Sequence, residues 1–279
     1  MDRLFVRVCW LFVLGLVSVA VVGIRLTAPK GNPEGVRPQP ASLPKENALI
    51  PIPAGTFSMG SDDGGYDEKP VRTVFLSAYE IQQYEVTQGQ YAEFVRATAY
   101  RSPLKLKGMM GESPVPNIER FNDPNQPVVR VAWHDAVAYC QWQGLRLPTE
   151  AEWEKGARGQ SGAPWPWGNH YRPGLGNFIG GEDGSLYTRN VGAYESDKSP
   201  YGLYDMAGNA REWIQDGYGE SYYQHAPARD PQGPPLGDMK VLRGSSWNDS
   251  HISGRVSARM KMFSNYRDTT IGFRCARSM

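Results

Sequence analysis

No helical period persists beyond Gly159, and this long stretch limits the folds that the chain can adopt. Short strand-like segments, Gly-rich turns and aromatic residues fill positions 165–279. The chain of 279 residues contains 31 Gly, 22 Pro, 8 Trp and 15 Tyr, which favours a loop-rich globule with aromatic side chains between short elements. Because helices are expected only in the first half and short strands throughout, the sequence predicts an α+β fold rather than alternating α/β units.

Two capping boxes predict where helices begin in the first half. Thr87 with Gln90, and Thr149 with Glu152, have the spacing at which two side chains and two backbone amides bond reciprocally. The helix after Thr149 is expected to end near Gly159. A further helix is expected over 134–143, a short strand and a turn over 50–60, a strand over 71–76, and a long loop over 101–126.

The N-terminal segment indicates the cellular compartment. Arg3 and Arg7 precede an apolar run over 8–24, which as a helix would span about 26 Å, close to the thickness of a bilayer core. Basic residues on its N-terminal side favour a cytoplasmic N-terminus. We expect an uncleaved anchor over 1–26 that holds the protein to the inner membrane. A cleaved signal peptide is the alternative, and it would give a secreted protein.

Beyond the anchor, the sequence predicts a Pro-rich spacer over 27–47 and one folded domain over 48–279, outside the cytoplasm and in the periplasm if anchored. The net charge of +1 gives no reason to expect nucleic acid as a partner. Cys9 lies inside the apolar run, which leaves Cys140 and Cys275 as the candidate disulfide pair in an oxidising compartment. Closing a loop of that length stabilises the fold by roughly 4–5 kcal/mol.

Eight segments in a fixed order give the chain a specific resemblance. They include PAGTFSMG (53–60), YEVT (84–87), QPVVRVAW (126–133), LRLPTEAEWE (145–154), YGLYDMAGNAREW (201–213), RGSSW (243–247) and IGFR (271–274), with 136–140 between the third and fourth. The ordered set resembles the formylglycine-generating enzyme, or sulfatase-modifying factor, family. The resemblance implies a single compact, irregular α+β domain related to the C-type lectin fold, here behind an N-terminal apolar helix. It also implies a disulfide between Cys140 and Cys275.

The resemblance further implies two structural calcium sites, since calcium takes six to eight oxygen ligands. At the first site the implied ligands are the side chains of Asp205 and Glu212 with the carbonyls of Gly208 and Ala210. The implied ligands of the second site are Asn177, Asp183 and the carbonyls of Phe178 and Ser185.

The family's oxidase holds copper on two cysteine thiolates, and this chain lacks both. The first cysteine position falls near Asp249 and the second within 252–254. Thiolates are the soft ligands that suit Cu(I), so we expect no copper–thiolate site. The candidate groove residues are polar or aromatic: Ser246, Trp247, Asn248, Asp249, His251, Arg255 and Arg259. Asp249 and His251 could act as a general acid and base, or these residues could be solvated loop polars.

Three functional hypotheses follow. We favour a membrane-tethered extracytoplasmic binding or maturation factor for an envelope protein or a small polar molecule. The first alternative is an oxidoreductase of the same fold that uses a cysteine-independent site. The second alternative is a lectin-like receptor. Whether the protein is an enzyme is left open by the sequence.

Overall fold

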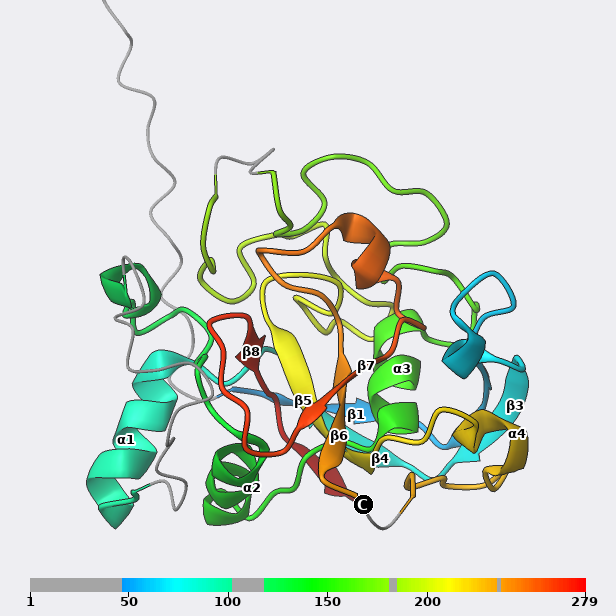
Figure 1. Ribbon diagram of the computed structural model, residues 1–279, viewed down its shortest axis with the longest axis horizontal. Coiled ribbons are helices and arrows are strands. Elements are labelled where there is room, and N and C mark those ends of the chain that lie inside the picture. Colours follow the sequence, from blue (N-terminus) through cyan, green and yellow to red (C-terminus); the bar gives the residue numbers. More distant parts are fainter. Residues whose placement is uncertain (1–46, 102–117, 181–184, 235–236) are drawn as a thin grey trace, which may run out of the picture. The chain divides into compact units, whose positions relative to one another are not determined.

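The computed structural model describes residues 47–101, 118–180, 185–234 and 237–279 (Figure 1). These residues form one compact unit of mixed helix and strand. The strands are β1 (Leu49–Ile52), β2 (Gly55–Met59), β3 (Arg72–Leu76), β4 (Tyr79–Gln82), β5 (Arg211–Gly217), β6 (Met239–Arg243), β7 (Met260–Phe263), β8 (Ile271–Gly272) and β9 (Ala276–Ser278). The helices are α1 (Gln88–Thr98), α2 (Trp133–Trp142), α3 (Glu150–Arg158) and α4 (Tyr222–His225), with short 3-10 helices η1 (Tyr66–Glu68), η2 (Ile118–Phe121) and η3 (His251–Gly254).

Three sheets make up the β structure of the described residues. The largest has the strand order β7-β6-β5-β8, a second has the order β1-β4-β9, and β2 pairs with β3. All these pairs are antiparallel except β5 with β8. The topology therefore joins the first and last strands of the domain through β4 rather than alternating strand and helix.

The two central strands of the four-stranded sheet, β5 and β6, bury side chains on both faces, because successive side chains of a strand point to opposite faces. Ile214 of β5 and Val241 of β6 belong to the core cluster that includes Trp153 of α3. Their neighbours Trp213 and Leu242 belong to the cluster that includes residues of α2. Helices α3 and α2 thus lie on opposite sides of this sheet, as Figure 1 shows.

The helix predictions are confirmed. Thr87 and Thr149 cap α1 and α3 through the expected reciprocal bonds with Gln90 and Glu152. Helix α3 ends at its C-cap residue Gly159. The third predicted helix is α2, whose buried residues include Cys140.

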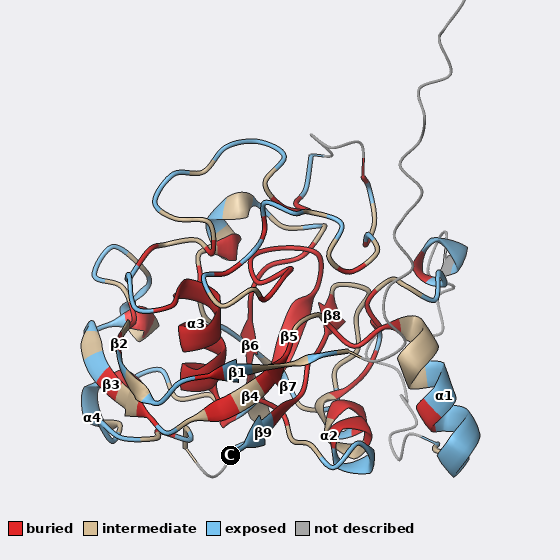
Figure 2. Ribbon diagram, turned by 180° about the vertical axis from the view of Figure 1, so that it is seen from behind, coloured by how far each residue is buried: buried red, intermediate tan, exposed pale blue. Residues whose placement is uncertain are grey.

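The burial of α3 was not anticipated. Every one of its nine residues is buried, including three glutamates, a lysine and an arginine (Figure 2). The N–H of Glu150 donates to the Asp216 carboxylate at 3.0 Å, and the ammonium of Lys155 donates to the carbonyls of Pro53 and Gly55. Buried charges are tolerated in a fold only when they are paired or hydrogen-bonded. Helix α3 is therefore a buried helix that polar contacts stabilise.

The predicted disulfide is confirmed. Cys140 of α2 is bonded to Cys275, next to β9, with 5.7 Å between the Cα atoms. The bond ties the chain's last described strand to a helix 135 positions earlier.

Three local predictions need correction. The second half, where no helix was expected, contains the short helices α4 and η3. The segment expected to form a short strand and a turn over 50–60 forms two strands, β1 and β2, which pair with β4 and β3 respectively. Part of the loop expected over 101–126 is the helix η2. No helix in the described ranges is long and apolar enough to cross a membrane, and the apolar run over 8–24 lies outside these ranges.

Candidate functional site

The groove segment, residues 245–259, connects β6 to β7 and contains all seven candidate groove residues. Ser246 is buried, and its hydroxyl donates to the Asp249 carboxylate while accepting the N–H of the exposed Asn248 at 3.3 Å. Asp249 also forms an ion pair with Arg211, at 2.6 Å between Oδ1 and Nη2. The Asp249 carboxylate is therefore held from two sides.

Both arginines of the groove segment are bound to carboxylates. Arg255 donates to the two oxygens of Glu68 at 2.8 Å, and Arg259 to those of Glu150 at 2.7 and 2.9 Å. The side chain of Arg259 is 0% exposed, whereas that of Arg255 is 23% exposed. Burial alone would raise the pKa of Glu150, but Arg259 and Arg243 hold it below its ordinary value. Arg259 therefore stabilises the fold, and Arg255 reaches the surface.

The aromatic candidates pack against other rings. His251 stacks on Tyr171 with 3.8 Å between ring centroids, and Trp247 lies against Tyr187 at 5.6 Å. The structure thus brings Ser246 together with Asp249 but gives His251 and Asp249 separate partners. His251 and Trp247 therefore pack against tyrosine rings, and His251 does not form an acid–base pair with Asp249.

A cavity of about 290 Å³ opens beside the groove segment and extends to the loop that contains η1. Ile252 lines it and is 62% exposed, so the rim offers an apolar contact. Three charged lining residues were not among the groove residues predicted from the sequence: Asp67, Glu68 and Arg211. They come from segments far from the groove segment, and no spacing pattern links them to it.

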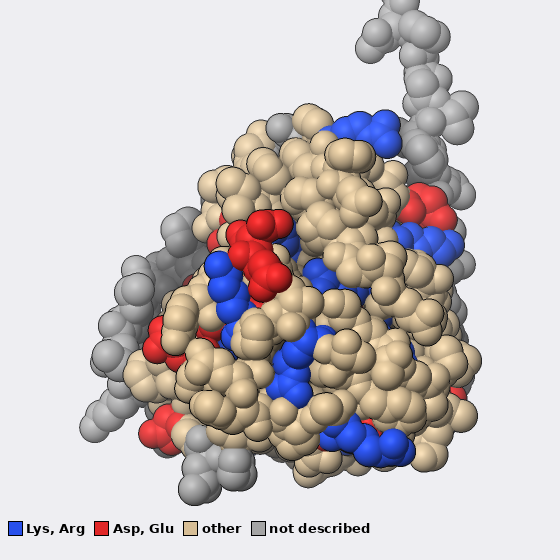
Figure 3. Space-filling model, turned by 90° about the vertical axis from the view of Figure 1, so that its right-hand side faces the viewer, with Lys and Arg blue, Asp and Glu red and all other residues tan. Residues whose placement is uncertain are grey.

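The charges around this cavity are mixed. Figure 3 shows acidic and basic side chains side by side, with no large patch of one sign, on the face that carries η1, β3 and α4. Such a surface suits a polar ligand with both donors and acceptors better than a polyanion.

The loop before β5, expected to bind calcium, is fixed by a buried glutamate. Glu85 accepts the N–H of Ala210 at 2.9 Å and the side-chain amide of Asn209 at 2.7 Å. Gly208 packs against Asn177, where a Cβ would lie 2.6 Å from the Asn177 carbonyl oxygen. The two segments expected to bind calcium are therefore in contact.

Four buried carboxylates lie around this loop, and we call them the loop carboxylate cluster: Glu85, Asp197, Asp205 and Glu212. Burial raises the pKa of Asp205 to about 7. Burial and the charges of Asp205 and Glu212 raise the pKa of Glu85 well above its ordinary value, and burial raises that of Asp197. Arg274 offsets part of this charge. The carboxyl groups that Arg274 does not neutralise are stabilised by bound protons or by a cation.

Two oxygens near this cluster lack hydrogen-bond partners in the described part of the chain. They are Oδ1 of Asn177 and Oδ1 of Asp197, both buried. Leaving a buried acceptor unsatisfied costs about 1–3 kcal/mol, and calcium binds amide, carbonyl and carboxylate oxygens. Both oxygens are therefore of the types that calcium binds. Phe178 and Ser185 are also buried, while Asp183 lies outside the described residues.

Glu212 has partners other than those expected of a calcium ligand. Its two oxygens accept bonds from Arg274 at 2.8–2.9 Å, and Oε2 also accepts the indole N–H of Trp153 at 3.0 Å. This carboxylate is committed to a buried ion pair. Within the described ranges, no group of three or more His, Cys, Asp or Glu could hold a metal, so a calcium site here would depend on amide and carbonyl oxygens as well.

Comparisons with known proteins agree with this architecture. Residues 35–279 match the sulfatase-modifying factor enzyme 1-like domain. The formylglycine-generating enzyme of Streptomyces coelicolor is 34% identical over 291 residues, which cover 86% of this chain and 92% of the relative. The inactive C-alpha-formylglycine-generating enzyme 2 of Bos taurus is also 34% identical, over 82% of this chain and 87% of that protein.

Solved structures show the same fold. PvdO from Pseudomonas aeruginosa has a TM-score of 0.71 at 28% identity, covering 83% of this chain and 94% of that protein. Treponema denticola variable protein 1 has a TM-score of 0.67 at 27% identity, covering 83% and 95%. Because the family match spans most of the chain and the fold agrees, this protein belongs to the sulfatase-modifying factor enzyme 1-like domain family.

Proposed function

We propose that the protein is a membrane-tethered, extracytoplasmic binding or maturation factor that has no copper–thiolate oxidase site. The observation that carries the proposal is the state of Asp249. Near the place where the resemblance puts the first cysteine of the family's oxidase, this carboxylate is held by Arg211 and by Ser246. The only two cysteines of the folded region are joined to each other. Tethering rests on the apolar run over 8–24.

The groove supports binding better than acid–base chemistry. Arg255 and Arg259 are fixed by carboxylates, and His251 is stacked on a tyrosine. The exposed Ile252 and the adjacent cavity provide apolar and polar contacts for a peptide or a small polar molecule. A relative that is 34% identical is itself described as an inactive enzyme, which is consistent with loss of the oxidase reaction on this fold.

Structural calcium is the second part of the proposal. Asn177 and Asp197 would supply unsatisfied side-chain oxygens and Asp205 a carboxylate, with backbone carbonyls of the 205–212 loop completing the set. Bound calcium would supply positive charge to the loop carboxylate cluster and fix the loops that flank the groove.

Metal content and oxidase activity of the purified full-length protein test the first part. We expect calcium without stoichiometric copper or iron. We also expect no aldehyde, by mass spectrometry, on a sulfatase peptide incubated with Cu(I), oxygen and a thiol reductant. Bound copper or iron together with oxygen consumption would overturn the proposal and favour the oxidoreductase alternative.

Photo-crosslinking in native envelopes tests binding at the groove. A photoreactive residue at position 252 should give a discrete adduct. A matched probe at the exposed Val95 of α1 should not. Adducts of equal yield at both positions, or none at 252, would remove the groove as a binding site. Adducts with glycans alone would favour the lectin-like alternative.

A further inference from the structure

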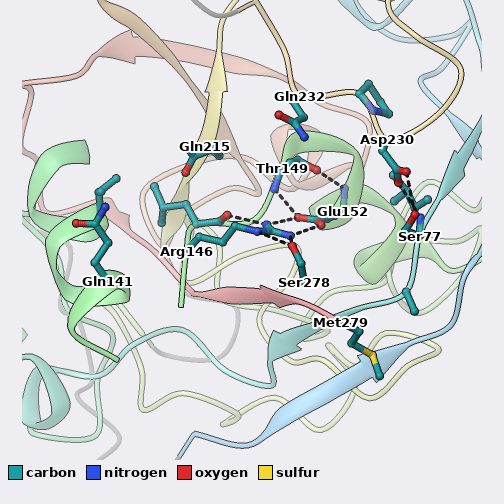
Figure 4. A pocket seen from close by; sticks show the side chains of 15 residues that line it. Ser77, Gln141, Arg146, Thr149, Glu152, Gln215, Asp230, Gln232, Ser278 and Met279 are labelled. Carbon is teal, nitrogen blue, oxygen red and sulfur yellow. Dashed lines mark hydrogen bonds and ion pairs between the residues drawn. The ribbon is translucent and has the colours of Figure 1, made fainter. Parts of the chain in front are cut away.

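A second cavity, of about 440 Å³, lies outside the groove. None of the residues that line it belongs to the groove segment or to the 205–212 loop. Figure 4 shows side chains from α2, α3, β5, β9 and the 230–232 segment around it. Its volume falls within the range of small-ligand sites.

The charged residues of this cavity are already paired. Arg146 donates to both oxygens of Glu152, at 2.7 and 2.6 Å, and also to Ser278 Oγ and the Leu147 carbonyl. The Asp230 carboxylate accepts from Ser77 at 2.7 and 2.9 Å. A charged ligand would have to displace one of these contacts, so the cavity favours an uncharged ligand.

Three carboxamides of the lining make no hydrogen bond with other described residues, and they come from separate elements: Gln141, Gln215 and Gln232. Gln215 is the one exposed residue of the otherwise buried β5. Because each carboxamide carries a donor and an acceptor, the set suits a ligand with the same pairing, such as a peptide group.

The backbone of β9 adds a donor and an acceptor at the same place. Ala276 exchanges both of its backbone bonds with Arg146, on the side of β9 away from β4. Since the direction of backbone groups alternates along a strand, the N–H and C=O of Ser278 point to the same side as those of Ala276. Ser278 lines the cavity, and no described residue pairs with its backbone there.

We propose that this cavity binds a short, uncharged peptide segment in extended conformation, which continues the pairing of β9 beyond Arg146. Its backbone would bond to Ser278 and to the carboxamides of Gln215 and Gln232. Main-chain pairing at a sheet edge is a general mode of peptide capture. Carbohydrate is disfavoured because no aromatic ring is among the described residues that line the cavity, where it could stack against a sugar.

Titration of the ¹⁵N-labelled full-length protein in detergent micelles tests the proposal. The probes are acetyl-Thr-Val-Thr-Val-amide, its backbone N-methylated form, and maltotriose. We expect saturable shifts of glutamine side-chain amide signals with the first peptide. The Gln215→Ala variant should weaken binding about tenfold, and N-methylation should abolish it. Gln143→Ala is the control, because Gln143 ends the same helix as Gln141 without lining the cavity.

The peptide proposal fails if the peptide produces no shifts up to about 10 mM, or if Gln215→Ala leaves the dissociation constant unchanged. It also fails if the N-methylated peptide binds equally well, or if maltotriose binds in place of the peptide. The Gln215 side chain makes no bond to the described residues, so this variant should fold normally, and an unchanged melting temperature verifies that. Crosslinking at position 252 should be unaffected by Gln215→Ala, which separates this cavity from the groove.

Discussion

Two buried charged regions of this domain differ in how their charges are balanced. In the α3 charge cluster, three glutamates of one helix face four arginines: Glu150, Glu152 and Glu154 with Arg146, Arg158, Arg243 and Arg259. In the loop carboxylate cluster, four acids share the guanidinium of Arg274. The first region is neutralised by the protein itself, whereas the second has more carboxyl groups than basic partners.

This difference separates structural charge from ligand-binding charge. In the α3 charge cluster each glutamate is paired with at least one arginine, and the pKa of Glu150 is accordingly lowered. Buried carboxylates in excess have raised pKa values, as Asp205 does, and such groups gain stability from an added cation. We therefore assign the α3 charge cluster to folding and propose calcium for the loop carboxylate cluster.

Removing Arg259 should have the largest effect. Arg259→Met leaves Glu150 as a buried charge without its closest partner, which costs about 3–5 kcal/mol. We expect a fall in melting temperature of roughly 10 °C that added calcium does not restore. The matched variant is Arg255→Met, which breaks a partly exposed pair and should cost about 1 kcal/mol or less. Similar losses from both variants would mean that burial does not distinguish these arginines.

Removing calcium should have the second-largest effect on stability. The pKa of Asp205 is about 7 in the folded protein and about 3.9 in an unfolded chain, so the folded state binds the proton more tightly. Without calcium, the stability contributed by this proton is complete below about pH 4. It is lost as the pH rises through about 7. The melting temperature in chelator should therefore fall as the pH rises from about 5 to about 8. At the higher pH, calcium at about 100 times its dissociation constant should restore about 2.7 kcal/mol of stability.

A melting temperature that is flat with pH in chelator and unchanged by calcium would contradict the charge imbalance. Magnesium serves as the control cation, because it requires a smaller, octahedral site.

Asp205→Asn should raise the stability of the protein without calcium and lower its stability with calcium. Removing one charge from the cluster should raise the stability of the calcium-free protein at about pH 8 by about 1–2 kcal/mol. In calcium, the same variant should lose most of the cation-dependent gain. The exposed Asp238→Asn is the control, and it should change neither value. Destabilisation by Asp205→Asn in chelator would show that the carboxylate serves a structural bond, such as the one from the N–H of Gly192.

Local sequence signals predicted the three longest helices, α1, α2 and α3, but neither the short helices nor the burial of α3. The capping boxes at Thr87 and Thr149 act within four residues, so they could be recognised directly. The charge pattern of α3 gives no sign that its glutamates are internal, because the buried partners Arg243 and Arg259 come from distant segments. Arg243 and Arg259 are 89 and 109 positions from the glutamates that they contact.

The candidate site shows the same limit. Resemblance directed attention to Asp249 and Arg255, but their partners Arg211 and Glu68 lie in other segments, and Glu68 is 187 positions from Arg255. Asp197 was missed because it lies outside the recognised segments. The sequence therefore indicated which side chains could bind a ligand or a metal. It did not indicate which of them are paired with an oppositely charged side chain, because those partners are brought together only by folding.

The smallest effect should come from a neutral contact in the α3 charge cluster. Thr149 and Thr87 are equally well buried helix caps, at 9% and 8% exposure. The start of α3 has additional support, because the carboxylate of Asp216 accepts the N–H of Glu150, and Glu152 is fixed by Arg146. We expect Thr87→Ala to lower the free energy of unfolding by about 1 kcal/mol and Thr149→Ala to lower it by about half of that. Chemical denaturation measures both values. If Thr149→Ala instead costs as much as Arg259→Met, then α3 depends on its cap rather than on its ion pairs, and the contrast between the two charged regions no longer accounts for its burial.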